Sequence, residues 1–133
     1  MPGPARAGAL IYARDLGLLT RFYRTVLQMM VCHQDGQLVV LENTDIQLLL
    51  HIIPAPYSGQ VVVTTPPELR EQSAIKLFFT VPSLAWAEAR AADLGGGLLP
   101  QQWSGSGFVV RNAFDPEGNV LQLREFFTSA TAR

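Results

Sequence analysis

The chain has 133 residues, of which 48% are hydrophobic and only 16% are charged. Its 10 basic and 11 acidic residues give a net charge of -1, so no basic face for nucleic acid is implied. No segment approaches the roughly 20 apolar residues of a membrane span, and the single cysteine, Cys32, excludes an intrachain disulfide. We expect one cytoplasmic domain over residues 1–133, with a large core and either a dimer interface or an apolar pocket.

The first predicted elements are a strand and a helix. An apolar run over residues 9–13 is typical of a strand, and Asp15 can accept a hydrogen bond from the free amides at the start of a helix. Over residues 16–28, apolar side chains recur at helical spacing and form one stripe. The residues of this stripe are Leu19, Phe22, Tyr23, Val26 and Leu27. The pattern predicts an amphipathic helix that buries the stripe.

Three further strands are predicted to complete the first half of the chain. They cover residues 29–33, 37–42 and 46–53. The first two form a hairpin, because Asp35-Gly36 supplies the positive φ that a tight turn needs. The first module, about residues 8–53, is therefore a β-α-β-β-β unit.

The second half repeats this order after a linker over about residues 54–72. A strand over residues 74–81 precedes Ser83, which can cap a helix over residues 84–94. The strands that follow cover residues 98–103, 108–112 and 119–127. The second module, about residues 73–127, is thus again β-α-β-β-β.

The two modules also match one another in sequence. Residues 38–40 in the first module correspond to residues 108–110 in the second, and Gln47 corresponds to Gln122. Two copies of a unit that is too small to bury its own apolar face are expected to pack together. The predicted fold class is α+β, with two tandem β-α-β-β-β modules.

Short motifs in both modules resemble a known superfamily. The motifs are Asp15-Leu16 with Phe22-Tyr23-Arg24 and Val26-Leu27, and Asp115-Pro116-Glu117-Gly118-Asn119 before Leu121-Gln122-Leu123. They resemble the vicinal oxygen chelate superfamily, which includes glyoxalase I, bleomycin-resistance proteins and extradiol dioxygenases. The resemblance implies a curled mixed sheet around a cleft between the modules, and a homodimer. The same scaffold hosts many chemistries, so the resemblance indicates the fold more than the function.

In the metal-dependent members of the superfamily, four positions facing the cleft hold a divalent ion. The resemblance places these positions at Gly8, Gln47, Lys76 and Gln122. Glycine has no side chain, a lysine must lose its charge before it can ligate, and two neutral amides do not offset the dehydration of a divalent cation. We therefore expect neither a metal ion nor another cofactor.

Strand alternation predicts which side chains line the implied cleft, because residues two apart share a face. Trp103, beside a Ser-Gly-rich turn, is a candidate wall for stacking. The predicted ligand-binding residues are Tyr12, Gln47, Leu49, Lys76, Phe78, Trp103, Gln122 and Arg124. Alternatives stay open: Lys76 can keep its head in water, and Gln47 and Gln122 can bond each other or a water molecule.

His51 is the candidate catalytic residue, because histidine exchanges protons near neutral pH. A hydrogen-bonded structural histidine is the alternative. We hypothesise that the chain is a glyoxalase/bleomycin-resistance-like protein that binds a small, partly apolar molecule without a metal ion. The basic residues Lys76 and Arg124 favour a neutral or anionic ligand. The alternative is a lyase, isomerase or dioxygenase that is metal-dependent or uses His51 and Lys76.

Overall fold

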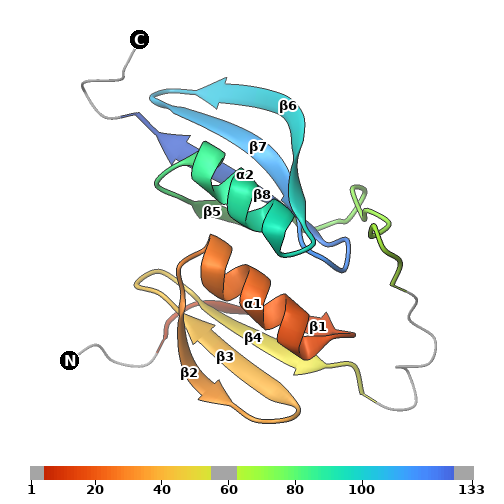
Figure 1. Cartoon of the computed structure of the whole chain (residues 1–133). Helices are drawn as coiled ribbons and strands as arrows, with labels where there is room; N and C mark the ends of the chain where they lie inside the picture. Colours follow the sequence, from red (N-terminus) through yellow and green to blue (C-terminus); the bar gives the residue numbers. More distant parts are fainter. Residues whose placement is uncertain (1–4, 55–62, 128–133) are drawn as a thin grey trace. The chain divides into compact units, whose positions relative to one another are not determined.

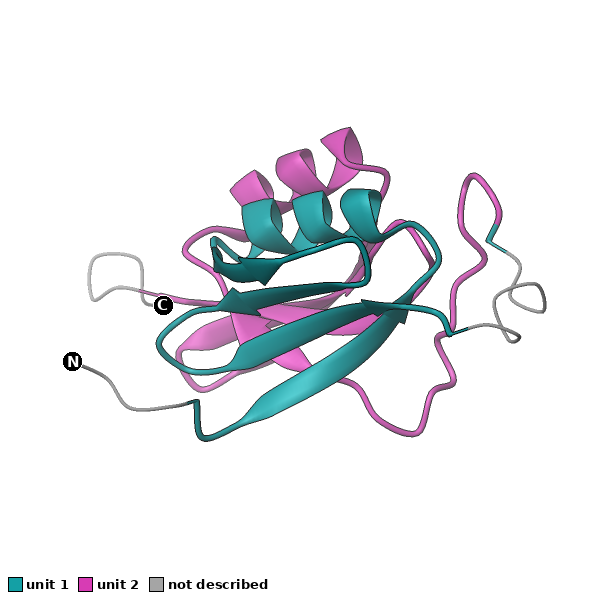
Figure 2. Cartoon of the chain, turned by 90° about the horizontal axis from the view of Figure 1, so that it is seen from below, with its two compact units in different colours: residues 1–63 teal, residues 64–133 magenta. Residues whose placement is uncertain are grey.

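The computed structural model describes residues 5–54 and 63–127 (Figure 1). The chain divides into two compact units, residues 1–63 and 64–133 (Figure 2). Within the described residues, each unit contains one helix and one four-stranded mixed sheet, in the order strand, helix, strand, strand, strand. The predicted α+β class with two β-α-β-β-β modules is confirmed. No helix in the described ranges is long and apolar enough to cross a membrane.

The first unit is built from five elements. They are β1 (Gly8–Ala13), α1 (Leu16–Val26), β2 (Met30–Gln34), β3 (Leu38–Glu42) and β4 (Gln47–Ile52). The strands lie in the order β1-β4-β3-β2, with β1 parallel to β4 and the other neighbours antiparallel. Helix α1 packs on β3 and β4, so the face of the sheet beneath it carries buried side chains such as Leu41, Leu48 and Leu50.

Helix α1 begins where the sequence predicts it, after the capping residue Asp15, but it ends earlier than predicted. The Asp15 carboxylate accepts a hydrogen bond from the Leu18 amide over 3.0 Å, as a capping residue does. The whole predicted apolar stripe is buried. The helix ends at Val26, before the predicted residue 28, because Gln28 has a φ of 53° and a left-handed residue does not continue an α-helix.

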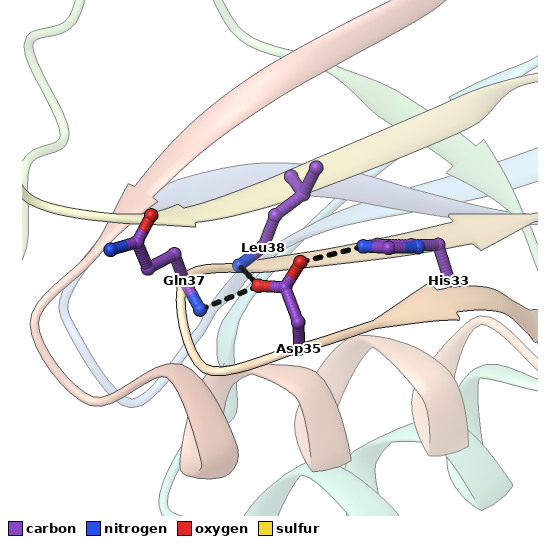
Figure 3. Close-up of polar contacts among 4 residues, drawn as sticks. All are labelled: His33, Asp35, Gln37 and Leu38. Carbon is purple, nitrogen blue, oxygen red and sulfur yellow. Dashed lines mark hydrogen bonds and ion pairs between the residues drawn. The ribbon is translucent and has the colours of Figure 1, made fainter.

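A carboxylate holds the turn between β2 and β3 (Figure 3). Asp35 Oδ1 accepts hydrogen bonds from the amides of Gln37 and Leu38 over 2.8 and 2.9 Å. Its Oδ2 lies 2.8 Å from Nε2 of His33, which donates to it. The hydrogen bond from the Gln37 amide, followed by those from His33 and Leu38, lowers the pKa of Asp35 to about 2. The hairpin is confirmed, but its expected cause is wrong: Gly36 has no positive φ, and the Asp35 side chain closes the turn.

The second unit repeats the plan of the first. Its elements are β5 (Phe78–Thr80), α2 (Leu84–Asp93), β6 (Gly97–Gly105), β7 (Phe108–Phe114) and β8 (Val120–Phe126). The strand order is β5-β8-β7-β6, with β5 parallel to β8. Helix α2 packs on β6 and β8, and the face beneath it buries Leu121 and Leu123.

Side chains from two elements cap α2. Ser83 Oγ accepts a hydrogen bond from the Trp86 amide over 3.1 Å, which confirms the predicted cap. In addition, Glu125 of β8 accepts a hydrogen bond from the Leu84 amide over 2.8 Å. Gly95, with a φ of 89°, follows the helix and ends it.

The segment before β5 is fixed to the turn between β7 and β8. The Arg70 amide donates to the Gly118 carbonyl over 2.8 Å, and Nη1 of Arg70 donates to Asn119 Oδ1 over 3.2 Å. Gly118 has a φ of 87°, and a Cβ there would overlap the carbonyl oxygen of Glu68. This end of the predicted linker therefore belongs to the second unit, whereas residues 55–62 of that linker lie outside the described residues.

The fixed segment explains why β5 is shorter than predicted. The strand begins at Phe78 and not at residue 74, and Ile75 keeps 78% of its surface exposed. Arg70 forms a parallel bridge with Asn119, so it occupies the sheet edge that a longer β5 would use. A pattern of apolar residues cannot reveal that this edge is already taken.

Strand β6 is longer than predicted, and its pairing with β7 is interrupted. It extends to Gly105, past the predicted residue 103. Its pairing with β7 shifts between Leu98 and Gln102, around Pro100. Proline has no N–H to contribute to the ladder, so a bulge at this place is expected.

Candidate functional site

Each sheet has one face that no helix of its own unit covers, and we name it the open face of that sheet. In β4, Leu48 and Leu50 are buried, whereas the residues between and beside them lie on the opposite face. The pairing of β1 with β4 adds Leu10 and Tyr12, which keep 48% and 55% of their surface exposed. On β1 and β4, the first open face therefore carries Leu10, Tyr12, Gln47, Leu49 and His51, and the pairing of β3 with β4 adds Leu38, Val40 and Glu42.

The second open face is richer in aromatic side chains. In β8 the buried residues Leu121 and Leu123 alternate with residues of the open face. Three large aromatic side chains are exposed here, with fractions of 56% for Phe78, 48% for Phe126 and 41% for Trp103. By strand register, this face carries Phe78, Thr80, Trp103, Phe108, Val110, Asn112, Gln122, Arg124 and Phe126.

Arg124 lies among three aromatic rings on the second open face. Its guanidinium carbon is 4.1 Å from the ring centre of Phe78, 5.1 Å from that of Phe126 and 5.4 Å from that of Phe108. Its Nε donates a hydrogen bond to Thr80 Oγ1 over 3.2 Å. Within the described part of the chain, its two terminal nitrogens donate to no protein acceptor. The guanidinium is thus held by its neighbours while its terminal N–H groups remain available.

His51 on the first open face makes one hydrogen bond that defines its chemistry. Its Nδ1 donates to the Ile52 carbonyl over 2.6 Å, since a carbonyl oxygen only accepts. The neutral ring therefore carries its lone pair on Nε2. The ring meets that of Tyr12 edge-on, with centres 6.1 Å apart and planes at 78°. The geometry leaves His51 with one proton-accepting nitrogen, and its role in catalysis stays a prediction.

The two glutamines have different surroundings. Gln47 Nε2 donates to Glu42 Oε1 over 3.1 Å within the first sheet, a partner that the sequence does not suggest. Gln122 is half-buried and lies opposite Asn112 in the second sheet. Asn112 Oδ1 is buried and accepts no hydrogen bond from the described residues.

The donors at the four motif positions do not fit a divalent metal ion. Gly8 lies opposite Gln47 in the first sheet, but Phe78, not Lys76, lies opposite Gln122 in the second. Lys76 is exposed and precedes β5. The set supplies no anionic ligand, and hard divalent cations require oxygen ligands that offset their dehydration. Among the described residues, no three His, Cys, Asp or Glu side chains gather as a metal site would require.

Strand register brings the predicted site residues together in two groups. Tyr12, Gln47, Leu49 and His51 share the first open face, and Phe78, Trp103, Gln122 and Arg124 share the second. Lys76 belongs to no strand. The sequence prediction missed Phe108 and Phe126, although alternation from Arg124 leads directly to Phe126. Ligand contact by these residues, and a cleft shared by the modules, stay predictions.

Solved structures share the fold of this chain. A glyoxalase/bleomycin resistance protein/dioxygenase family enzyme from Burkholderia phytofirmans PsJN matches with a TM-score of 0.68 and 16% identity, covering 93% of this chain and 100% of that one. A glyoxalase-related enzyme from Fulvimarina pelagi matches at 0.66 and 17%, covering 90% and 86%. Lactoylglutathione lyase from Agrobacterium tumefaciens matches at 0.56 and 22%, covering 94% and 96%. No protein-family model and no curated protein matches the sequence.

These matches test the resemblance that the sequence motifs indicate. Each covers at least 90% of this chain, so each includes both units. Identities at this level support a common fold and leave the activity open. The chain has the fold of the glyoxalase/bleomycin resistance/dioxygenase proteins, which is the fold of the vicinal oxygen chelate superfamily.

Proposed function

We propose that the chain binds a small, partly apolar molecule on the open faces of its sheets, without a metal ion. The observation that carries the proposal is the gathering of exposed apolar and aromatic side chains on these faces beside a few polar groups. Contiguous exposed apolar surface marks binding sites, and small-molecule sites combine apolar walls with a few oriented polar groups. Names such as bleomycin resistance protein and lactoylglutathione lyase among proteins of this fold support a small molecule as the partner.

The proposal omits a metal ion because of the chemistry of the donor set. Glycine and lysine stand at two of the four motif positions, and Gln47 already donates to Glu42. Elemental analysis of protein purified without chelators tests this part. We expect less than stoichiometric metal, and one divalent ion per chain would refute it.

A binding screen with matched variants tests the main claim. We would screen aromatic acids, their neutral amides and aromatic amines by thermal shift, and measure stoichiometric binding by calorimetry. Phe126→Ser and Tyr12→Ser remove exposed side chains of the two open faces. Ile75→Ser is the control, because Ile75 is even more exposed but lies outside the strands. We expect at least one of the two open-face variants to bind the compound more weakly, and the control to bind it as wild type does. The proposal fails if no compound binds to wild type, or if Ile75→Ser weakens binding as much as the open-face variants do.

We also propose that the chain forms a homodimer, which its high apolar share supports. Sedimentation of the purified chain tests this, and a monomer at micromolar concentration would contradict it. The same Phe126→Ser and Tyr12→Ser variants separate two uses of the open faces. If they dissociate a dimer and the wild-type chain binds no compound, the faces serve a second copy of the chain and not a small molecule.

Acid–base catalysis on the first open face is the second candidate function. It is favoured by the lone pair on Nε2 of His51, whose ring is fixed by the Ile52 carbonyl and faces Tyr12. For any compound that binds, we would measure its turnover with the wild-type chain and with His51→Gln. Turnover that survives in His51→Gln would exclude this role.

A further inference from the structure

We propose that Arg124 recognises a carboxylate group, so that the ligand of the second open face is an apolar or aromatic monocarboxylate. The inference rests on the proposed binding function and specifies its ligand class. It depends on three features of the second unit alone: the fixed guanidinium, the charge around it, and the row of side chains that leads away from it.

The guanidinium of Arg124 is positioned before any ligand arrives. The rings of Phe78, Phe126 and Phe108 surround it, and Thr80 accepts the hydrogen bond from its Nε. An unconstrained arginine loses rotamer freedom when it binds an anion, and this loss weakens binding. Here the neighbouring side chains have already removed much of that freedom. A planar fork held in this way is suited to two parallel hydrogen bonds with a carboxylate.

Among the described residues of the second open face, the positive charge of Arg124 has no counter-charge. The side chains assigned above to the second open face include no carboxylate. Glu125, its neighbour in β8, faces α2 and accepts the hydrogen bond from the Leu84 amide. Arg111, in contrast, pairs with Glu88 at 2.9 Å. One unmatched positive charge is complementary to a ligand with one negative charge.

The surroundings of Arg124 favour a carboxylate over a phosphate. A guanidinium can bind either group through paired hydrogen bonds. A phosphate monoester carries up to two negative charges at neutral pH, and burial of an uncompensated charge is costly. Among the described side chains of this face, Arg124 is the one cation, and phenyl rings surround it. The single positive charge of Arg124 can balance a monoanion, such as a carboxylate, but not a dianion.

A row of paired residues indicates where the rest of the ligand lies. Register places Thr80 opposite Arg124, Arg124 opposite Val110, and Val110 opposite Trp103. The row therefore leads from the guanidinium on β8, across an apolar residue on β7, to an exposed indole ring on β6. Two strand spacings amount to roughly 10 Å, the length of an aromatic ring with a short side chain. An aromatic body over Val110 can thus stack on Trp103 while its carboxylate meets Arg124.

Paired ligands and paired variants test the inference. The probes are trans-cinnamate and 3-phenylpropionate, each compared with its neutral amide, and phenyl phosphate as the phosphate arm. Affinities are measured by calorimetry for wild type, Arg124→Met, Arg124→Lys and the control Arg21→Met. Arg124→Met removes the charge with little loss of volume, whereas Arg21→Met removes the charge of an exposed arginine on α1, outside both open faces. Thermal melting confirms that each variant is folded.

We expect wild type and Arg21→Met to prefer the acids over the amides by about tenfold or more, as a charge-assisted bidentate contact provides. Arg124→Met should lose this preference by binding the acid more weakly and the amide unchanged. Arg124→Lys, which keeps the charge without the planar fork, should retain only part of it. Equal affinity of wild type for acid and amide, or an acid preference that survives in Arg124→Met, overturns the inference.

Three outcomes have separate meanings. Tighter binding of phenyl phosphate than of the acids, lost in Arg124→Met, would overturn the assignment to a carboxylate. If neither acids nor amides bind to wild type, and no compound of the wider screen does, the proposed binding function itself fails. If amides or other neutral compounds bind and acids gain nothing, the binding function stands and only the role of Arg124 is refuted.

Discussion

Arg111 on β7 forms a two-pronged ion pair with Glu88 on α2. Its Nη1 and Nη2 donate to the two carboxylate oxygens over 3.1 and 2.9 Å. Its Nε donates to the Leu99 carbonyl over 2.9 Å, so the whole edge of the guanidinium is used. The pair connects the helix of the second unit to its sheet, with side-chain exposures of 15% for Arg111 and 46% for Glu88.

Substitution of Glu88 should cost little, because solvent screens a half-exposed carboxylate. We expect Glu88→Gln to lower the free energy of unfolding by about 0.5 to 1 kcal/mol at pH 7, measured by urea denaturation. Arg111 hydrogen bonds hold the pKa of Glu88 below its ordinary value of 4.5. A lowered pKa means that the stabilisation is complete above that value and is lost as the pH falls below it. The difference between variant and wild type should therefore shrink at pH 3, and an undiminished difference would contradict the role of the pair.

The control for this prediction is a more exposed ion pair on the same helix. Arg90 and Asp93 lie 3.0 Å apart, with side-chain exposures of 43% and 66%. Asp93→Asn should change the stability by no more than about 0.5 kcal/mol. If Asp93→Asn lowers the stability more than Glu88→Gln does, solvent exposure does not decide how much each ion pair contributes.

The cap of α2 should be measurable through Ser83. Ser83→Ala leaves the Trp86 amide without its side-chain acceptor and should destabilise the chain by about 1 kcal/mol. Ser83→Asp retains an acceptor and should restore most of that loss. Chemical denaturation of the three proteins checks the order, and equal stability of the alanine and aspartate variants would argue against capping.

Neighbouring leucines on opposite faces of β4 should respond differently to truncation. Leu50 is fully buried, so Leu50→Ala should cost about 2 to 5 kcal/mol through lost transfer energy and a cavity. Leu49 is only partly buried on the open face, so Leu49→Ala should cost about 1 kcal/mol or less. Thermal and urea unfolding compare the two. Similar losses at both positions would mean that the open face is packed as tightly as the core.

The turn carboxylate Asp35 should titrate far below an ordinary aspartate. An NMR titration of its carboxyl carbon should give a pKa of about 2, against an ordinary value of 3.8. In His33→Ala the pKa should rise but stay below 3.8, because the Gln37 and Leu38 amides still donate. The contribution of the turn is complete above the ordinary value and is lost as the pH falls through about 2. An unshifted pKa in wild type would rule out the turn geometry.

Local signals explain why much of the fold could be predicted from the sequence. The caps at Asp15 and Ser83, and the stripe that begins at Leu19, involve residues within one or two helical turns. The alternation of buried and partly exposed residues in β4 is equally local. Such patterns fix the type of an element and the face on which a side chain lies, and the open-face positions of Gln47 and Arg124 follow from them.

Pairing between distant segments explains what could not be predicted. Phe78 lies opposite Gln122, and Arg70 forms a bridge with Asn119; both contacts join segments that are far apart in the sequence. The neighbours of Arg124 likewise depend on register, since Phe108 reaches it only through the pairing of β7 with β8. A single sequence records alternation along one strand but not the alignment of that strand with its neighbours.

The attachment of Arg70 to the loop at Gly118 decides where the second half of the chain can be cut. A gene fragment that starts at β5 would delete the backbone that meets the Gly118 carbonyl and the Asn119 side chain. A fragment that starts upstream of Glu68 would keep these contacts. We expect this fragment, in isolation, to be more stable than one that starts at β5.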